Sequence, residues 1–242
     1  DEVAGTAFFV MDFLDGDLFW NPMIPTVSNQ DRTEIYQNKN KTLALLHGVD
    51  YKKIGLEDYG KPGNYVARQV ARWSKQYKAS ETDDIEAMNN LIDWLPKNIP
   101  DDDETSIVHG DYRLDNMILK NNQVMGILDW ELSTLGHPIA DFSYHCLSWR
   151  TQEAFWDQAK LKELGVPSEK EYMDMYCENT GKDLSKNWEF YMAFNMFKIA
   201  GILQGILGRV RDGTASSKHA EDRGMMVYPL SEAAWNTIKE NF

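Results

Sequence analysis

Asp111, Asn116 and Asp129 are the residues of this sequence whose types and spacing could carry chemistry. Asp111 and Asn116 stand five residues apart in the segment HGDYRLDN, which lies between two short apolar runs. A third apolar run, Val124–Leu128, leads directly into Asp129. A β-hairpin formed by the second and third runs would bring Asn116 and Asp129 to the same end of a small sheet.

This group of oxygens suits the transfer of a phosphoryl group. The amide of Asn116 and the carboxylate of Asp129 are ligands that a hard cation such as Mg²⁺ prefers. Asp111 would then be free to accept the proton of a hydroxyl group. The catalytic loop of protein kinases has a histidine two residues before its catalytic aspartate and an asparagine five residues after it. His109 and Asn116 stand at both positions relative to Asp111. An isolated His-Gly-Asp is usually a simple turn, but the full spacing argues against that alternative.

Composition and charge narrow the class of protein. The chain has 242 residues, 43% of them hydrophobic, which is enough for one large domain or two small ones. A formal net charge of −13 disfavours nucleic acid and membrane surfaces as partners. Two cysteines, Cys146 and Cys177, are too few for a disulfide framework, so we expect reduced thiols and a cytoplasmic protein.

The hydrophobic periodicity predicts a mostly helical α+β chain with its small β element at the polar cluster. Strands are expected at 7–11, 105–108, 117–119 and 124–128, and helices at 31–47, 65–77, about 82–95, 139–149, 153–164, 169–179, 188–211 and 229–241. A mobile loop is expected between Gly213 and Gly224. The helix at 188–211 contains Asn195, Lys198 and Gln204, which argues for a buried helix and against a membrane span.

The motif HGD-x4-N, followed by LDWE, resembles the aminoglycoside phosphotransferase and choline kinase-like family. The segments LDWELSTLGHPIADFSY, DYGKPGNYVARQVARW and FWNPMIP resemble the branch that includes the kinase-like domain of acyl-CoA dehydrogenase family members ten and eleven. The resemblance extends over nearly the whole chain. It implies a protein kinase-like fold and an ATP- or GTP-dependent phosphotransferase that acts on a hydroxyl of a small molecule. The branch suggests a hydroxyacyl-CoA as that molecule.

The resemblance also implies roles for individual residues. It makes Asp111 the catalytic base, puts Arg113 near the γ-phosphate, makes Asn116 and Asp129 ligands of Mg²⁺, and places Met11, Asp12 and Phe13 at the hinge beside adenine, with Ile118 as the apolar floor beneath it. His109 and Asp141 are expected to support the catalytic loop, although an acid at Asp141 could also simply favour the start of a helix. Glu131 is expected to be a further partner of the metal site.

The sequence departs from this family before the hinge, where a β-rich N-terminal lobe is expected. No candidate for its phosphate-covering loop or its lysine precedes Met11. We therefore expect residues 1–16 to be the hinge strand and linker, and residues 17–242 to be a helical C-terminal lobe. Within that lobe the catalytic loop is expected at 109–116 and the metal-binding segment at 127–131.

Two other functions stay open from the sequence. The chain could be a non-catalytic kinase-like lobe that acts as an interaction module, or the same acids could carry out metal-dependent hydrolysis. The expected partners are a nucleotide and a small hydroxylated substrate, and an exposed hinge surface would favour self-association into a homo-oligomer.

Overall fold

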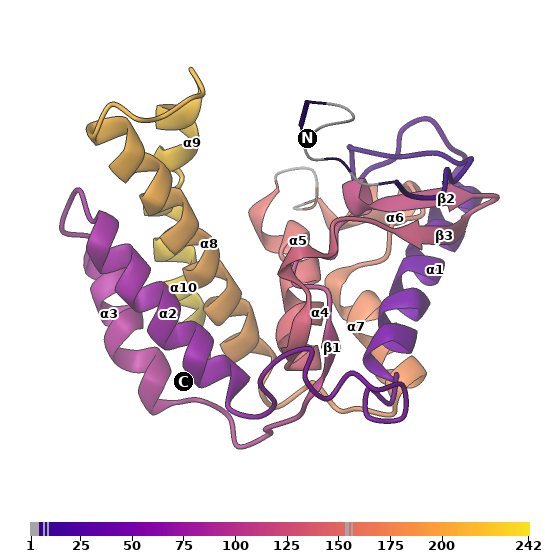
Figure 1. The fold of residues 1–242 in the computed structure, drawn as a ribbon, viewed down its shortest axis with the longest axis horizontal. Coiled ribbons are helices and arrows are strands. Elements are labelled where there is room, and N and C mark those ends of the chain that lie inside the picture. Colours follow the sequence, from indigo (N-terminus) through magenta and orange to yellow (C-terminus); the bar gives the residue numbers. More distant parts are fainter. Residues whose placement is uncertain (1–4, 7, 9, 153–154, 156) are drawn as a thin grey trace.

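The computed structural model describes residues 5–6, 8, 10–152, 155 and 157–242. These residues form a mostly helical α+β chain (Figure 1), as the sequence predicts. Its α-helices are α1 (Asn29–His47), α2 (Tyr65–Ser80), α3 (Glu86–Trp94), α4 (Pro138–Cys146), α5 (Ser148–Thr151), α6 (Gln158–Glu163), α7 (Glu169–Thr180), α8 (Trp188–Arg211), α9 (Ala220–Met225) and α10 (Val227–Asn241). Its strands are β1 (Ser106–Val108), β2 (Met117–Lys120), β3 (Gln123–Ile127) and β4 (Thr134–Gly136), and short 3₁₀ turns lie at η1 (Leu95–Lys97), η2 (Leu114–Asn116) and η3 (Trp130–Leu132).

The predicted hairpin is present as β2 and β3. The two strands pair antiparallel, with Met117 opposite Ile127 at the open end. Asn121 and Asn122 form the turn with φ values of 50° and 62°. A two-residue hairpin turn of this hand needs positive φ at both positions, and asparagine tolerates that conformation better than most residues. The turn therefore sets the register of the two residue pairs next to it, and an irregularity between Ile118 and Leu119 shifts the register by one residue toward the open end.

A second small sheet pairs β1 with β4, which the sequence does not predict. Ile107 lies opposite Leu135 in this antiparallel pair. The pairing ties the chain that follows Asp129 back to the strand that precedes His109. Three residues are too few for an alternating pattern to be recognised in a sequence, so β4 carries no local signal.

The helices form two groups, joined through α4 (Figure 1). Helix α8 packs against α2, α4, α9 and α10, while α1 packs against α7 and the hairpin. Of the described helices, α8 is long and apolar enough to cross a membrane. However, 67% of its most apolar stretch of 18 residues is buried inside the fold. A core helix of a globular protein has the same properties, as the sequence prediction for 188–211 proposes.

The predicted N-terminal strand at 7–11 is wrong for the residues described there, and Ala7 and Phe9 lie outside them. Phe8, Val10 and Met11 adopt no strand conformation. Val10 is 88% exposed, and no described strand pairs with this segment. The first residue that bridges to the sheet is Asp17, which pairs with Leu119. A β-rich composition alone does not make a strand without a partner for its backbone.

Several helix boundaries also differ from prediction. Helix α3 begins at Glu86 and not near Thr82, because the Thr82 hydroxyl instead accepts a hydrogen bond from Gln204 of α8. The helix expected at 139–149 divides at Leu147, whose N–H bonds to the carbonyl of Tyr144 three residues back and tightens the turn there.

Two predictions in the second half of the chain are wrong in part. The helix expected at 153–164 begins only at Gln158, capped by Asp157, and Glu153, Ala154 and Trp156 lie outside the described residues. The loop expected up to Gly224 already contains the start of α9. That short helix is held by the packing of Gly224 against Leu207 of α8, which leaves no periodic pattern in the sequence.

Candidate active site

The hairpin brings Asn116 and Asp129 to the same end of the sheet, as the sequence predicts. The N–H of Leu128, next to Asp129, donates to the carbonyl of Asn116 at 2.8 Å. Asp129 is exposed and adopts a left-handed conformation with φ 62° and ψ 58°. Such a backbone costs energy for residues other than glycine and is least unfavourable for aspartate and asparagine. The chain thus turns sharply at Asp129, just after the end of β3.

Asn116 and Asp111 are in direct contact. The amide nitrogen of Asn116 donates to the backbone carbonyl of Asp111 at 3.0 Å and to its Oδ2 at 3.1 Å. Both hydrogen bonds use the nitrogen end of the amide. The oxygen end of Asn116 is therefore left to face another group, and Asp111 is held beside it.

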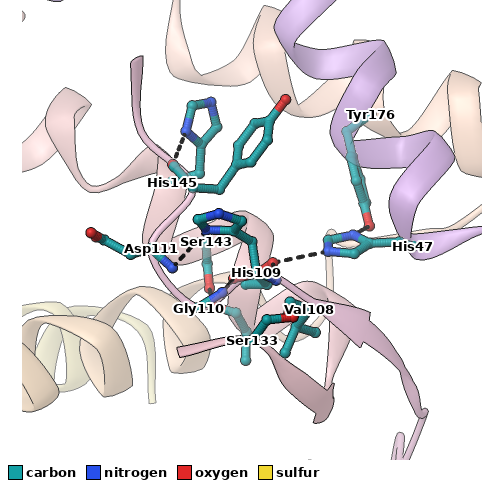
Figure 2. Close-up of polar contacts among 12 residues, drawn as sticks. His47, Val108, His109, Gly110, Asp111, Ser133, Ser143, His145 and Tyr176 are labelled. Carbon is teal, nitrogen blue, oxygen red and sulfur yellow. Dashed lines mark hydrogen bonds and ion pairs between the residues drawn. The ribbon is translucent and has the colours of Figure 1, made fainter. Parts of the chain in front are cut away.

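Asp141 anchors the loop of residues 109–116, here called the HGD loop. Its buried carboxylate accepts the backbone N–H groups of His109 and Gly110, each at 2.8 Å, and lies 3.2 Å from Nε2 of His47. Burial opposes ionisation, but the hydrogen bonds from His47, His109 and Gly110 together lower the pKa of Asp141 below its usual value. The predicted supporting role of Asp141 is thus confirmed, and Figure 2 shows His47 and Tyr176 extending the network behind the loop.

His109 joins the HGD loop to the segment before Asp129. Its Nδ1 accepts the N–H of Asp111 at 3.2 Å, and its Nε2 donates to the carbonyl of Leu128 at 2.9 Å. The ring is fully buried. A single side chain therefore links the backbone at Asp111 to the end of β3.

Gly110 is required by the path of this loop. Its φ is 83°, and a Cβ built there would lie 2.7 Å from the backbone carbonyl oxygen of Leu132. An L-amino acid would meet both backbone strain and a clash with a backbone atom at this position. The middle residue of the HGD motif is thus set by the close approach of the segment after Asp129.

Tyr144 and Lys198 are two residues near Asp111 that the sequence analysis misses. The Tyr144 hydroxyl donates to Oδ1 of Asp111 at 2.7 Å, and burial raises the pKa of Tyr144 above its usual value. The ammonium of Lys198 lies 4.4 Å from the centroid of the Tyr144 ring, and burial lowers the pKa of Lys198. One sequence signal exists for Tyr144, because it follows Asp141 by one helical turn and so shares its face of α4. Lys198 comes from α8, far along the chain, and has no such signal.

Arg113 lies at the edge of this group. Its Nε is 3.6 Å from Oδ1 of Asp111, and its guanidinium also pairs with Asp115. The side chain is about half exposed. The structure thus brings Arg113 beside the Asp111 carboxylate, while its predicted place near a γ-phosphate stays a prediction.

The residues predicted to contact adenine lie beside the hairpin. Ile118 is half-buried on β2, and its Cγ2 would be 2.6 Å from a Cβ on Gly16. The neighbouring Leu14 packs against Gly126 of β3 in the same way. Met11, Asp12 and Phe13 directly precede this contact and are exposed. The structure therefore brings Leu14 and Gly16, which follow the predicted hinge, against the hairpin that carries Ile118.

A cavity of about 550 Å³ lies beside residues that contact Asp111. Tyr144 and Arg113, whose side chains contact the Asp111 carboxylate, also form part of its wall. Volumes of this order are typical of sites for small molecules. Two residues that contact the Asp111 carboxylate thus also line a cavity of ligand size.

The fold and this loop are of the protein kinase-like type. The model of the phosphotransferase enzyme family matches residues 1–176. A crystal structure from Ralstonia eutropha, described as a candidate aminoglycoside phosphotransferase, is 49% identical with a TM-score of 0.92, and the match covers 96% of this chain and 73% of that one. The chain therefore belongs to the phosphotransferase enzyme family.

More distant structures share the fold alone. Choline kinase from Cryptosporidium parvum superposes with a TM-score of 0.58 at 12% identity, over 94% of this chain and 70% of that one. Among curated proteins, acyl-CoA dehydrogenase family member 10 of Mus musculus is 41% identical and member 11 of Homo sapiens is 39% identical. Each match covers 99% of this chain but 23% and 32% of the respective relative. The chain thus spans about a quarter to a third of the length of these curated relatives.

Proposed function

We propose that this chain transfers the γ-phosphoryl group of ATP or GTP to a hydroxyl group of a small molecule. The observation that supports this most directly is the position of Asp111. Its carboxylate contacts Asn116 on one side, and Tyr144 in the wall of the cavity on the other. A hydroxyl bound in the cavity could deliver its proton to Asp111 while the oxygen attacks a phosphorus atom held at the end of the hairpin.

Asn116 and Asp129 would hold Mg²⁺ at that end. The residues fit the ion, because the Asn116 amide nitrogen is already bonded to Asp111 and its oxygen is left for a ligand. No group of three or more His, Cys, Asp or Glu side chains suited to a metal occurs among the described residues. Mg²⁺ commonly takes one or two carboxylates from the protein and completes its shell with nucleotide phosphates and water. When bound, the ion would neutralise the charge that develops on the phosphate oxygens.

The remaining residues would position the nucleotide and the acceptor. Met11, Asp12 and Phe13 would bond the edge of adenine, and Ile118 would pack under its ring. Tyr144 donates to Asp111 and would hold its carboxylate toward the cavity. Arg113 would stabilise the transferred group, because its guanidinium already lies beside Asp111.

We propose a hydroxyacyl-CoA as the acceptor and the cytoplasm as the compartment. The curated relatives are named as acyl-CoA dehydrogenases, which supports an acyl thioester. The cavity wall contains many apolar side chains, which suits an acyl chain: Trp20, Leu114, Leu147, Ile199, Leu203 and Leu230. Both cysteines of the chain, Cys146 and Cys177, are free thiols, as expected in a reducing compartment.

The test is a phosphorylation screen with the protein at its natural length. Hydroxylated acyl-CoAs, aminoglycosides and small alcohols are each incubated with Mg-ATP or Mg-GTP, and phosphorylated product is measured by mass spectrometry. For the acceptor that reacts, Asp111→Asn should lower kcat about 100-fold or more, since a positioned general base contributes about 10²–10⁴-fold. The affinity for Mg-nucleotide should change by less than about threefold, because Asp111 is not assigned to the nucleotide.

The matched control is Asp174→Asn, which removes an exposed carboxylate of α7 paired with Lys170. That variant should keep the wild-type kcat. A kcat that Asp111→Asn leaves unchanged would contradict the assignment of the base. Product formed without any nucleotide would contradict phosphoryl transfer itself and would favour metal-dependent hydrolysis.

A further inference from the structure

The cavity beside Asp111 combines apolar walls with three basic side chains. Its lining comes mainly from α1, the HGD loop, α4, α5, α8 and α10, together with Trp20 and Pro22 before α1. The basic residues are Lys39 of α1, Arg113 of the HGD loop and Arg150 of α5. Which of these charges is free decides what kind of molecule the cavity favours.

Two of the three cations already have carboxylate partners. Arg150 binds Glu169 and Glu189 through both sides of its guanidinium. Arg113 pairs with Asp111 and Asp115. A charge that is paired in this way has little attraction left for a further anion.

Lys39 is different. The residue is only 3% exposed, and within the described part of the chain its ammonium makes no ion pair and no hydrogen bond. The ammonium lies 3.9 Å from the centroid of the Tyr36 ring and 5.8 Å from that of Tyr172. Burial lowers the pKa of Lys39 to about 7, so a substantial part of the population carries the charge at neutral pH. Aromatic faces attract a cation but supply only part of what the loss of water costs.

The other titratable groups near Lys39 supply no counter-charge. His145 uses both ring nitrogens, one on the carbonyl of Tyr112 at 2.7 Å and one on the hydroxyl of Tyr172 at 2.8 Å. Burial also lowers the pKa of His145 to about 3, so the ring is neutral. Burial raises the pKa of the Cys146 thiol well above its usual value, so it carries no charge either. The hydroxyls of Tyr36, Tyr112 and Tyr172 are likewise neutral, since burial raises the pKa of each.

We propose that Lys39 binds an anionic group, a carboxylate or a phosphate, on the molecule that occupies this cavity. The ligand class is thus an amphiphile, with an apolar body against the walls and one anion at the α1 side. That this molecule is the phosphate acceptor rests on the proposed function, whereas the anion site itself does not. The anion supplies the negative charge for Lys39 that no carboxylate of the described residues provides.

The first experiment compares three probes that share one apolar chain: hexanoate, hexyl phosphate and uncharged hexanol. Their binding to the wild-type protein is measured at pH 6 by ligand-observed NMR. We expect at least one anion to bind about tenfold or more tightly than hexanol, the change that one favourable charge contact of about 1.4 kcal/mol gives. The stronger of the two anions identifies the head group, a carboxylate or a phosphate.

Variants then assign the preference to Lys39. Lys39→Met should abolish the preference and leave the hexanol affinity unchanged, whereas Lys41→Met, which removes an exposed lysine from the same helix, should keep it. The wild-type preference should weaken from pH 6 to pH 9 as Lys39 loses its proton. Lys39→Arg should retain the preference at pH 9, because arginine stays protonated. The thermal midpoint of Lys39→Met should equal or exceed that of the wild type, since an unpaired buried cation is removed.

Equal binding of all three probes to the wild type would overturn the proposal, and so would an anion preference that survives in Lys39→Met. Phosphorylation of an acceptor without any anion preference would leave the proposed function standing and remove only the role of Lys39. Anion binding that depends on Lys39, in a protein that phosphorylates no acceptor, would keep the anion site and remove the proposed function.

Discussion

Replacing Asp141 by asparagine tests whether this carboxylate holds the HGD loop in place. Its oxygens accept the N–H groups of His109 and Gly110, both at 2.8 Å, and lie near His47. An asparagine has one oxygen and one NH₂ group. One backbone N–H would keep its acceptor, and the other would face a donor in a buried site.

The cost follows from these contacts. A hydrogen bond to a charged group contributes about 1.5–3 kcal/mol, and breaking a buried charged pair costs about 3–5 kcal/mol. We therefore expect Asp141→Asn to lose about 3–5 kcal/mol of unfolding free energy. A typical domain has about 5–15 kcal/mol in total, so the variant should still fold. Its kcat for the accepted substrate should fall about tenfold or more, because Asp111 is no longer held against the end of the hairpin.

The assay is urea unfolding followed by tryptophan fluorescence. The matched control is Asp102→Asn, which changes a half-buried carboxylate that accepts hydrogen bonds from Asn187 and Tyr191, away from the HGD loop. That control should lose stability and keep its kcat. The fluorescence of the eight tryptophans reports unfolding in both variants.

The pH dependence of the difference gives an independent check. The pKa of Asp141 is lower in the folded protein than its ordinary value of 3.8. Its stabilisation is therefore fully present above about pH 5, and it is lost progressively as the pH falls through 3.8 toward the folded pKa. The gap between the wild type and Asp141→Asn should narrow over that range. A loss below about 1 kcal/mol at pH 7, or a kcat equal to that of the wild type, would refute this account of the loop.

Two further substitutions test the backbone around the site. Asp129→Ala should lose about 1–2 kcal/mol in urea unfolding because φ is 62° there, whereas Asp129→Asn and Asp129→Gly should lose little. All three should weaken the Mg²⁺ dependence of nucleotide binding, and unchanged Mg²⁺ titrations would remove Asp129 from the proposed metal site. Gly110→Ala should lose about 1–3 kcal/mol of unfolding free energy from the positive φ, and more from the clash with Leu132. The control is Gly213→Ala, which has a φ of 69° and open space around its Cβ, and it should show the backbone cost alone. Equal losses in the two glycine variants would contradict the close approach at Gly110.

The parts of the site that the sequence predicts are those set by neighbours along the chain. The spacing of Asp111, Asn116 and Asp129, and the turn between the two strands, are short-range features. The hairpin follows from them, because apolar runs on both sides of two asparagines have few other ways to pair. The contact between Asn116 and the end of β3 also depends on the register shift between Ile118 and Leu119, which the sequence does not predict.

The parts that the sequence does not predict depend on helices that meet from distant positions. Lys39 looks like one more charged residue of an exposed helix face until α4 and α7 cover it. Thr82 is a residue type that often caps helices, but its hydroxyl accepts a hydrogen bond from Gln204 of α8 instead. The N-terminal strand fails for a related reason, since its described residues find no partner strand. No local pattern carries this information, because each case is decided by tertiary packing.

The ring of His109 has a consequence for how proteins with this architecture can diverge. It fixes the backbone at Asp111 to the end of β3, and Asp141 fixes the same loop to α4, so the spacing between the proposed base and the proposed metal segment is set inside the core. Much of the cavity wall instead comes from α5, α8 and α10, which make none of these bonds. Substitutions in those helices can change which molecule is bound without disturbing the reaction geometry. One chemical centre can in this way be inherited unchanged while the choice of acceptor evolves around it.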